Sequence, residues 1–261
     1  MAPMATQPRR VCPDDLQVAM PISIPEAIEV FVSGFCHGKS QTYPYVPIKV
    51  GNLWVMRDDP PRKKSRKTEV ITYGQSPEET VVAIQQAELG WHFLCHIHEP
   101  DDDYDGIRAK YKELGYRAMS TEGLFIHDLK NIPNYESDPP AREIPNQETW
   151  QTIPQRASQA NKLRPDTWLF GIWDETIDYG WVTSVPVKDF AWVSGLYVHQ
   201  SDRGKGYGRA LMTKLLASDR EHGITQSVLL ASSDGARLYP HLGYQKIGIL
   251  QMFCPTKREE G

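Results

Sequence analysis

Residues 190–216 read FAWVSGLYVHQSDRGKGYGRALMTKLL, and this stretch decides the fold of the chain. It opens with Phe190 to Val198, an uncharged run of aromatic and β-branched residues that is typical of a largely buried strand. It closes with Arg209 to Leu216, where apolar residues recur at helical spacing. Between the two lies a glycine-rich turn, Arg203-Gly204-Lys205-Gly206-Tyr207-Gly208. The pattern predicts a strand, a tight turn and a helix in direct succession.

The turn has the composition of an anion-binding loop. Three glycines at alternate positions let backbone N–H groups converge on an anion, because no Cβ blocks its approach. The helix N-terminus adds partial positive charge, and Arg203 and Lys205 add whole charges. We interpret the turn as a pyrophosphate cradle, although glycines also serve tight turns that bind no ligand. The Walker pattern does not fit, because Gly206 stands where it requires Ser or Thr, and the dinucleotide fingerprint requires a different glycine spacing.

Here the chain resembles the GNAT superfamily of acyl-CoA-dependent N-acyltransferases. Arg203, Gly206 and Gly208 occupy the defining positions of its Arg/Gln-x-x-Gly-x-Gly/Ala phosphate loop, and Leu238-Tyr239-Pro240-His241-Leu242-Gly243-Tyr244 looks like its Phe-Tyr-x-x-Leu-Gly-Phe segment. The resemblance covers about residues 145 to 255. It implies acetyl-CoA as co-substrate, no metal, and direct acyl transfer to an amine in a ternary complex.

The resemblance also implies roles for individual residues. Tyr239 is expected to protonate the departing CoA sulfur, since a phenol can donate to a developing thiolate, although it could simply pack between helix and sheet. The expected acetyl-CoA-binding residues are the end of the strand, the cradle and one serine of the next loop: Leu196, Tyr197, Val198, Arg203, Gly204, Lys205, Gly206, Tyr207, Gly208 and Ser232.

The general base stays open. Many family members carry a glutamate on the strand before the cradle, but this chain has no carboxylate between Asp189 and Asp202. Asp189, Asp174, His199 or a chain of waters could remove the proton from the amine.

An internal echo suggests a duplicated chain. Tyr111-Lys112-Glu113-Leu114-Gly115-Tyr116 matches 239–244 at Tyr, Leu, Gly and Tyr with a constant offset of 128 residues (111 to 239, 116 to 244). Strand 68–73, helix 77–89 and strand 91–98 repeat the order of strand 190–198, helix 206–221 and strand 226–231. The first copy lacks the cradle, because its turn carries Pro77 and no basic residue. We therefore expect it not to bind CoA.

These patterns predict an α+β protein with two GNAT-like domains, each a mixed, mostly antiparallel sheet flanked by helices. The expected parts are a flexible tail at 1–14, a degenerate GNAT-like domain at 15–130, a proline-rich linker at 131–145 and an N-acetyltransferase domain at 146–261. The aromatic, proline-bearing stretch 39–51 is expected to be an irregular loop.

Composition is typical of a soluble, cytoplasmic protein. A net charge of -4 over 261 residues gives no support for nucleic acid as a partner, and no window is apolar enough to span a membrane. Cys12, Cys36, Cys95 and Cys254 are scattered without CxxC pairs and read as reduced thiols. The chain could also form a homodimer.

Two further patterns have a plain and a functional interpretation. Residues 62–67 carry five basic residues in six, as in a nuclear signal or a phosphate-contacting patch, but a solvated loop compensated by Asp58 and Asp59 is favoured. His92, His96 and His98 alternate onto one face of a strand, where a metal site is conceivable but three imidazoles on one strand are usually too spread to share an ion.

The leading hypothesis is an acetyl-CoA-dependent N-acetyltransferase. The alternative is a non-catalytic acyl-CoA-binding or sensing protein, suggested by the missing carboxylate, and a third hypothesis is an interaction protein that uses residues 62–67. The acceptor stays open among small amines, amino acids, antibiotics and protein N-termini or lysines, because variable loops build acceptor pockets in this fold.

Overall fold

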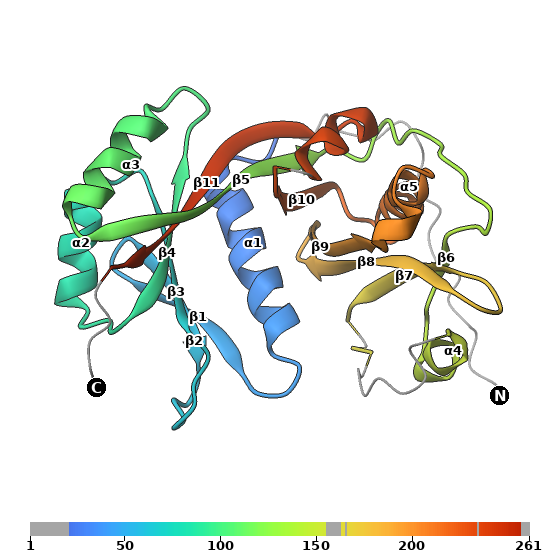
Figure 1. Cartoon of the computed structure of the whole chain (residues 1–261), viewed down its shortest axis with the longest axis horizontal. Coiled ribbons are helices and arrows are strands. Elements are labelled where there is room, and N and C mark those ends of the chain that lie inside the picture. Colours follow the sequence, from blue (N-terminus) through green and yellow to red (C-terminus); the bar gives the residue numbers. More distant parts are fainter. Residues whose placement is uncertain (1–20, 155–162, 165, 234, 257–261) are drawn as a thin grey trace, which may run out of the picture.

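A computed structural model describes residues 21–154, 163–164, 166–233 and 235–256, so the expected tail at 1–14 lies outside the described residues. The strands form one mixed sheet of 11 strands in the order β1-β2-β3-β4-β11-β5-β10-β9-β8-β7-β6 (Figure 1). Neighbours are antiparallel except the parallel pairs β3–β4 and β9–β10. The strands are β1 (Tyr45–Val50), β2 (Leu53–Asp58), β3 (Thr68–Tyr73), β4 (His92–His98), β5 (Tyr116–His127), β6 (Arg142–Glu143), β7 (Trp168–Trp173), β8 (Asp178–Val187), β9 (Phe190–Val198), β10 (Gln226–Ala231) and β11 (Gln245–Pro255).

Helices cover both faces of the sheet. They are α1 (Ile24–Lys39), α2 (Pro77–Gln86), α3 (Tyr104–Glu113), α4 (Gln147–Thr152) and α5 (Tyr207–Glu221), with the 3-10 helices η2 (Gln200–Asp202), η3 (Gly235–Arg237) and η4 (Tyr239–Leu242). One core cluster joins α1 to one face, while α5 and the pair α2 and α3 pack in separate clusters on the other. Within the described ranges, no helix has the length and apolar character needed to cross a membrane.

Local signals predicted most of these elements. Ser23 and Ser76 each accept a hydrogen bond from the backbone N–H of the third helical residue. The carboxylates of Glu26 and Glu79 each accept one from the backbone N–H of the capping serine, so α1 and α2 both begin with a capping box. Strand 190–198 has the bounds of β9, and strand 226–231 those of β10. The capping residues and the uncharged strand patterns of the sequence therefore locate these elements correctly.

The expected irregular loop at 39–51 is wrong for its second half. Tyr45–Val50 forms β1, which pairs with β2 through a turn in which Gly51 has a φ of +57°. Pro47 lies within this strand and obscured it in the sequence. A proline is tolerated there because β1 is at the edge of the sheet, where a missing N–H breaks no ladder on its open side.

The two halves of the chain share one sheet through an exchange of strands. The first half runs β3, α2, β4, α3, β5, and the second runs β9, α5, β10, η4, β11. However, β11 lies between β4 and β5, and β5 lies between β11 and β10. Figure 1 shows β5 in green and β11 in red side by side across the centre. The structure therefore has one continuous sheet where the sequence suggested two.

Helix α1 joins the halves on one face of that sheet. It packs on β1 and β2 of the first half and on β8, β9 and β10 of the second. Its closest approach is at Gly34, where an added Cβ would lie 2.2 Å from Trp192 Cβ. Phe31 packs beside this contact, with its ring centre 5.0 Å from that of Trp192. A helix from the first half thus covers the strand that leads into the cradle.

Replacing Gly34 with alanine is expected to lower the free energy of unfolding by about 1–3 kcal/mol, because Trp192 Cβ sits at the root of its side chain and cannot rotate away. Gly38→Ala, in the same helix with nothing within 4 Å, should instead stabilise by about 0.5–1 kcal/mol. Urea denaturation of both variants measures the difference. Equal effects at the two positions would contradict the close contact.

The basic run at 62–67 is held by a buried acid. Asp58, which is 1% exposed, accepts hydrogen bonds from Arg62 Nε at 2.8 Å and from the Arg66 backbone at 3.0 Å, and it also forms an ion pair with the Arg66 side chain. Arg66 further donates to the carbonyl groups of Tyr43 and Pro44. Both arginines therefore fasten the loop between β2 and β3, in agreement with the favoured plain interpretation.

Candidate functional site

The candidate site begins where β9 parts from β10. Their register runs from Gln226↔Phe190 to Val228↔Trp192, and no further pair forms between them in the described chain. Beyond that point β9 has an irregularity at Gly195, whose φ is +66°, and the register with β8 shifts. The end of β9, Leu196–Val198, therefore keeps an unpaired backbone edge that faces a gap in the sheet.

The cradle follows this edge and opens helix α5. Gly204 and Gly206 have φ values of +80° and +88°, and an added Cβ at either would meet no atom within 4 Å. Gly206 is the N-cap of α5 and supplies no side-chain cap, and the first turn of α5 contains no acidic residue. The first N–H groups of α5 are therefore available to an external anion, with Arg203 and Arg209 beside them.

A cavity of about 600 Å³ joins these parts. Every sequence-predicted cofactor residue except Lys205 lines it: Leu196, Tyr197, Val198, Arg203, Gly204, Gly206, Tyr207, Gly208 and Ser232. Lys205 instead directs its Nζ to Asp202 Oδ1 at 2.7 Å, and this hydrogen bond is the main cause that lowers the pKa of Asp202. The cradle therefore brings Arg203, but not the Lys205 side chain, to the cavity.

The sequence reasoning missed four lining residues, Asp202, Arg209, Gly235 and Leu238. Arg209 could have been found, because it falls in the first turn of the predicted helix, where a cation lies close to a bound anion. Gly235 and Leu238 belong to the loop after β10, and only the three-dimensional structure brings that loop against the cradle. An added Cβ on Gly208 would lie 3.5 Å from Leu238 Cδ2, so the two segments form one wall.

Tyr239 lies directly behind the lining rather than in it. It is 7% exposed, and an added Cβ on Gly235 would lie 3.5 Å from Tyr239 Cε2 and 3.6 Å from Ser232 Oγ. Burial raises its pKa to about 12, so its hydroxyl stays protonated at neutral pH. Tyr239 opens the short 3-10 helix η4, which contains Pro240 and is capped by Gly243 with a φ of +92°.

The three side chains considered as a general base lie in different places. Asp174 accepts hydrogen bonds from the Tyr179 hydroxyl and from the turn at Thr176 and Ile177, which hold its pKa far below the usual range. Asp189 precedes β9, at the end of that strand away from the cradle. His199 follows β9 directly and packs 5.0 Å from the Tyr197 ring centre. None of the three lines the cavity, but the His199 ring contacts Tyr197, which does.

Other candidate groups have structural partners. His92 and His96 hydrogen-bond to the hydroxyl groups of Tyr116 and Tyr111, at 3.0 and 2.8 Å. His98 stacks on His96 with ring centres 4.3 Å apart. In the described ranges, no group of three or more His, Cys, Asp or Glu side chains could hold a metal ion. Cys36, Cys95 and Cys254 are buried free thiols, and Cys12 lies outside the described residues.

Comparison with known proteins finds a family that matches part of the chain and solved structures with a similar fold. Residues 166–246, which include both sequence motifs, match the acetyltransferase (GNAT) domain family. The fold resembles a GCN5-related N-acetyltransferase from Kribbella flavida, with a TM-score of 0.60 and 14% identity over 88% of this chain and 95% of that one. A GCN5-related N-acetyltransferase from Sphaerobacter thermophilus gives a TM-score of 0.50 and 14% identity over 87% and 91% of the two chains. At these identities the likeness concerns the fold alone.

A curated relative matches a shorter stretch. The chain is 30% identical over 71 residues to Endoribonuclease YbeY from two strains of Thermus thermophilus. That stretch is 27% of this chain and spans about half, 46%, of the relative. Both structural neighbours above, in contrast, are GNAT proteins aligned over most of their length. Residues 166–246 thus match the GNAT acetyltransferase family, and the mixed sheet with its flanking helices has a GNAT-like fold.

Proposed function

We propose that this protein is an acetyl-CoA-dependent N-acetyltransferase with its donor site in the cavity at the cradle. One observation carries the proposal: the open N-terminus of α5, its two left-handed glycines and the unpaired end of β9 border a single cavity. An elongated ligand with a diphosphate and a peptide-like arm fits that combination. The diphosphate would meet backbone N–H groups, and the arm would add to the open edge of β9.

In this proposal the chain holds the thioester and stabilises the charges that develop. The amine nitrogen attacks the carbonyl carbon of the thioester, an N–C bond forms, and the C–S bond breaks. Backbone N–H groups at the end of β9 would stabilise the oxyanion, as preorganised donors do in acyl transfer. The Tyr239 hydroxyl would give its proton to the departing sulfur, and the ammonium proton would leave to His199 or to water.

The first half would be a GNAT-like copy that has lost this site. Its helix α2 occupies the place of α5, but Ser76 caps it, and Glu78 and Glu79 lie in its first turn. These features satisfy and neutralise the helix N-terminus that α5 leaves open. The copy would therefore have a structural role, while the second half would contain the catalytic site.

Replacing Tyr239 with phenylalanine is expected to lower kcat about 100-fold and to leave the KM for acetyl-CoA nearly unchanged. The reason is that only the proton donor is lost, while the residues lining the cavity stay the same. Release of free thiol from acetyl-CoA, with a panel of amines as acceptors, measures it. Tyr111→Phe, at the echoed position in the first half, is the matched control and should retain turnover per folded molecule.

A sensing function without catalysis is the second candidate. It is favoured by the lining of the cavity: among the described residues that line it, Asp202 is the one carboxylate, and Asp202 is already paired with Lys205 and Ser201. If acetyl-CoA binds and no amine of the panel is acetylated, this second function replaces the first. An unchanged kcat in Tyr239→Phe would instead show that Tyr239 is not the proton donor, and the proposed acetyltransferase activity would still stand.

A further inference from the structure

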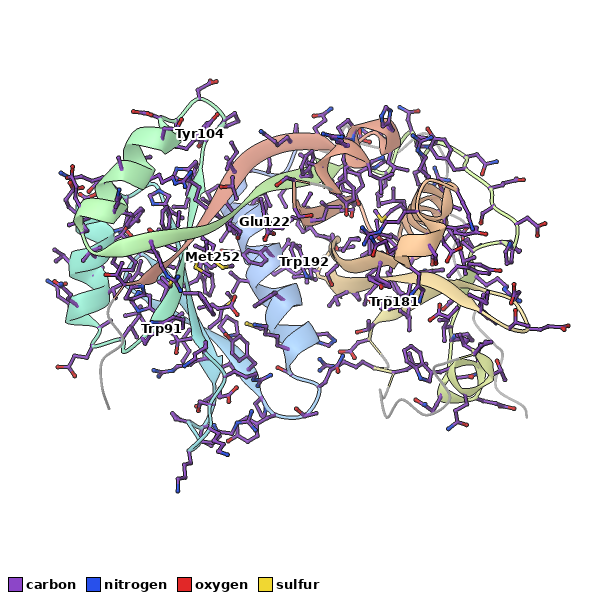
Figure 2. All side chains as sticks on the ribbon, viewed as in Figure 1. Trp91, Tyr104, Glu122, Trp181, Trp192 and Met252 are labelled. Carbon is purple, nitrogen blue, oxygen red and sulfur yellow. The ribbon has the colours of Figure 1, made fainter. Side chains whose placement is uncertain are left out.

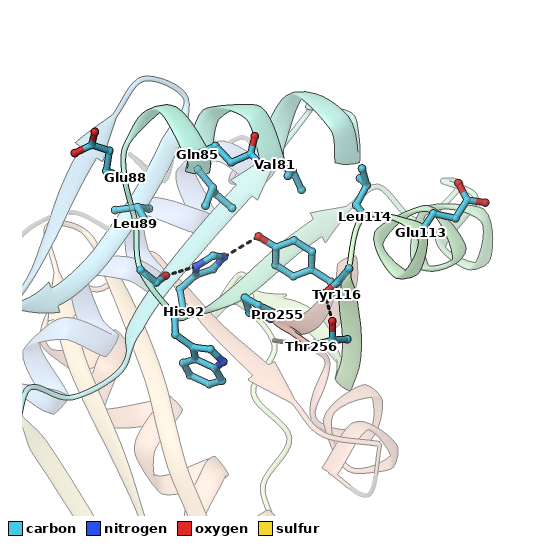
Figure 3. A pocket seen from close by; sticks show the side chains of 14 residues that line it. Val81, Gln85, Glu88, Leu89, His92, Glu113, Leu114, Tyr116, Pro255 and Thr256 are labelled. Atoms are coloured by element: carbon cyan, nitrogen blue, oxygen red, sulfur yellow. Dashed lines mark hydrogen bonds between the residues drawn. The ribbon is translucent and has the colours of Figure 1, made fainter. Parts of the chain in front are cut away.

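A second cavity of about 780 Å³ lies in the first half of the chain, away from the cradle. It opens between the C-terminal ends of α2 and α3, and the starts of β4 and β5 and the end of β11 close it from below (Figure 3). It shares no lining residue with the cavity at the cradle. Its volume is in the range of small-molecule sites. Figure 2 shows Trp91, which lines this cavity, in the first half of the molecule and apart from Trp181 and Trp192 of the second half.

Part of the wall of this cavity is apolar. Val81, Ile84 and Leu114 line this part, and the Tyr116 ring stands between Val81 and Leu114 (Figure 3). The Gly90 carbonyl accepts a hydrogen bond from His92 Nδ1 at 2.7 Å, so His92 Nε2 accepts the Tyr116 hydroxyl at 3.0 Å. Burial raises the pKa of Tyr116 to about 12, and its phenol stays neutral. This part of the wall therefore suits an apolar body rather than a charged group.

The end of α2 gives the rim negative charge that no basic residue of its last turn balances. Helix C-termini carry partial negative charge, and those of α2 and α3 both reach the cavity. The last turn of α2 has no basic residue, and Glu88 follows it with a φ of +50°. The left-handed backbone at the end of a helix favours glycine, and the partial negative charge of that end favours a cation. A glutamate at this position is unfavourable on both counts. A bound positive charge would balance the Glu88 carboxylate and the partial charge of the helix end.

The last turn of α3 carries Lys110 and Lys112, whereas the last turn of α2 carries no cation. Lys110 Nζ pairs with Glu113 and Glu78, at 3.2 Å in each case, and Lys67 Nζ lies 4.9 Å from the centre of the Trp91 ring. No ion pair to Glu88 forms within the described ranges, and no lysine or arginine of those ranges lines the cavity. Glu88 is thus the acid left for a ligand.

We propose that this cavity binds a small organic cation, with an alkyl or aryl body between α2 and Tyr116 and an ammonium group at Glu88 and the end of α2. The ammonium group supplies the charge that the helix end lacks, and the body displaces water from the apolar walls. The site is independent of acetyl-CoA and of the chemistry proposed at the cradle.

The test compares 2-phenylethylamine with its neutral analogue 2-phenylethanol by titration calorimetry on the full chain. The amine should bind at least about tenfold more tightly than the alcohol. Added salt should weaken the binding of the amine and leave the binding of the alcohol unchanged. Quenching of Trp91 fluorescence, lost in Trp91→Phe, would place the ligand at this cavity. Equal affinity for amine and alcohol, or no binding of the amine, would overturn the proposal.

Three variants complete the test. Glu88→Gln should bring the amine close to the affinity of the alcohol. Glu221→Gln, at the C-terminal end of α5 and outside both cavities, is the matched control and should bind as the wild type does. Gln85→Trp fills the mouth from an exposed position and should abolish binding without disturbing the core. If Gln85→Trp binds the amine with wild-type affinity, the cation site lies elsewhere and the assignment is wrong.

Discussion

Replacing Gly206 with glutamate is expected to weaken acetyl-CoA binding about 100-fold or more. Gly206 caps α5, and its φ of +88° points an added side chain into open space at the cavity. A carboxylate there would occupy the anion position and repel a diphosphate, and Arg203 would pair with it instead of with the ligand. Titration calorimetry with acetyl-CoA measures the loss, which corresponds to about 2.7 kcal/mol.

The chain offers a matched control for this change. Gly74, in the turn before α2, has a φ of +70° and likewise nothing within 4 Å of an added Cβ. Gly74 precedes Ser76, the N-cap of α2, so Gly74→Glu brings a comparable backbone strain and the same charge near the N-terminus of the corresponding helix in the first half, and it should leave acetyl-CoA binding unchanged. Gly206→Ala separates size from charge and should cost less than the glutamate. Wild-type affinity in Gly206→Glu would refute the donor site and with it the proposed function.

Asp219 is expected to make the stability of the protein strongly dependent on pH. Its side chain in α5 is fully buried, Oδ1 accepts a hydrogen bond from Ser184 Oγ at 2.8 Å, and Oδ2 has no partner in the described chain. Burial is the main cause that raises the pKa of this carboxyl from 3.8 to about 7. The unfolded chain gives up this proton near pH 3.8 and the folded chain near pH 7. Between these values the folded state binds more protons, so stability falls as pH rises, by about 4 kcal/mol in total.

Asp219→Asn should remove this slope, because the amide keeps a neutral group of the same shape at every pH. The variant should match the wild type near pH 4 and exceed its free energy of unfolding by up to about 4 kcal/mol near pH 8. Urea denaturation across this pH range measures both. Ser184→Ala removes a hydrogen bond that lowers the pKa of Asp219, so its slope should persist and extend to higher pH. A wild-type slope in Asp219→Asn would show that another group titrates.

The parts of the fold that local chemistry determines were predictable from the sequence. Capping serines and a proline in the first helical turn set α1 and α2, and short uncharged runs rich in apolar residues set β9 and β10; each of these signals acts within a few residues. Pairing between distant segments is different. The register of β11 with β4, such as Leu250↔Ile97, depends on which edges remain open once the other strands have paired. Neither strand has a sequence periodicity that predicts this register.

The candidate site shows the same division. The glycines and Arg203 were predictable, because the need for a left-handed backbone and for positive charge appears in residue type. The direction of a flexible side chain was not. Lys205 turns to Asp202, three residues earlier, whereas residue type alone ranks this lysine equally with Arg203. Tyr239 is close to the cavity because its ring packs beside Gly235, which lines the cavity.

The exchange of β5 and β11 makes the order of synthesis matter. On the ribosome, β4 emerges long before its neighbour β11, which is the last strand of the sheet. At about 5–20 residues per second, the interval is on the order of ten seconds. During that time the nascent first half exposes an open strand edge that other chains could pair with. Its sheet closes only when the final segment arrives, so truncation near the C-terminus would damage the half of the protein that was made first.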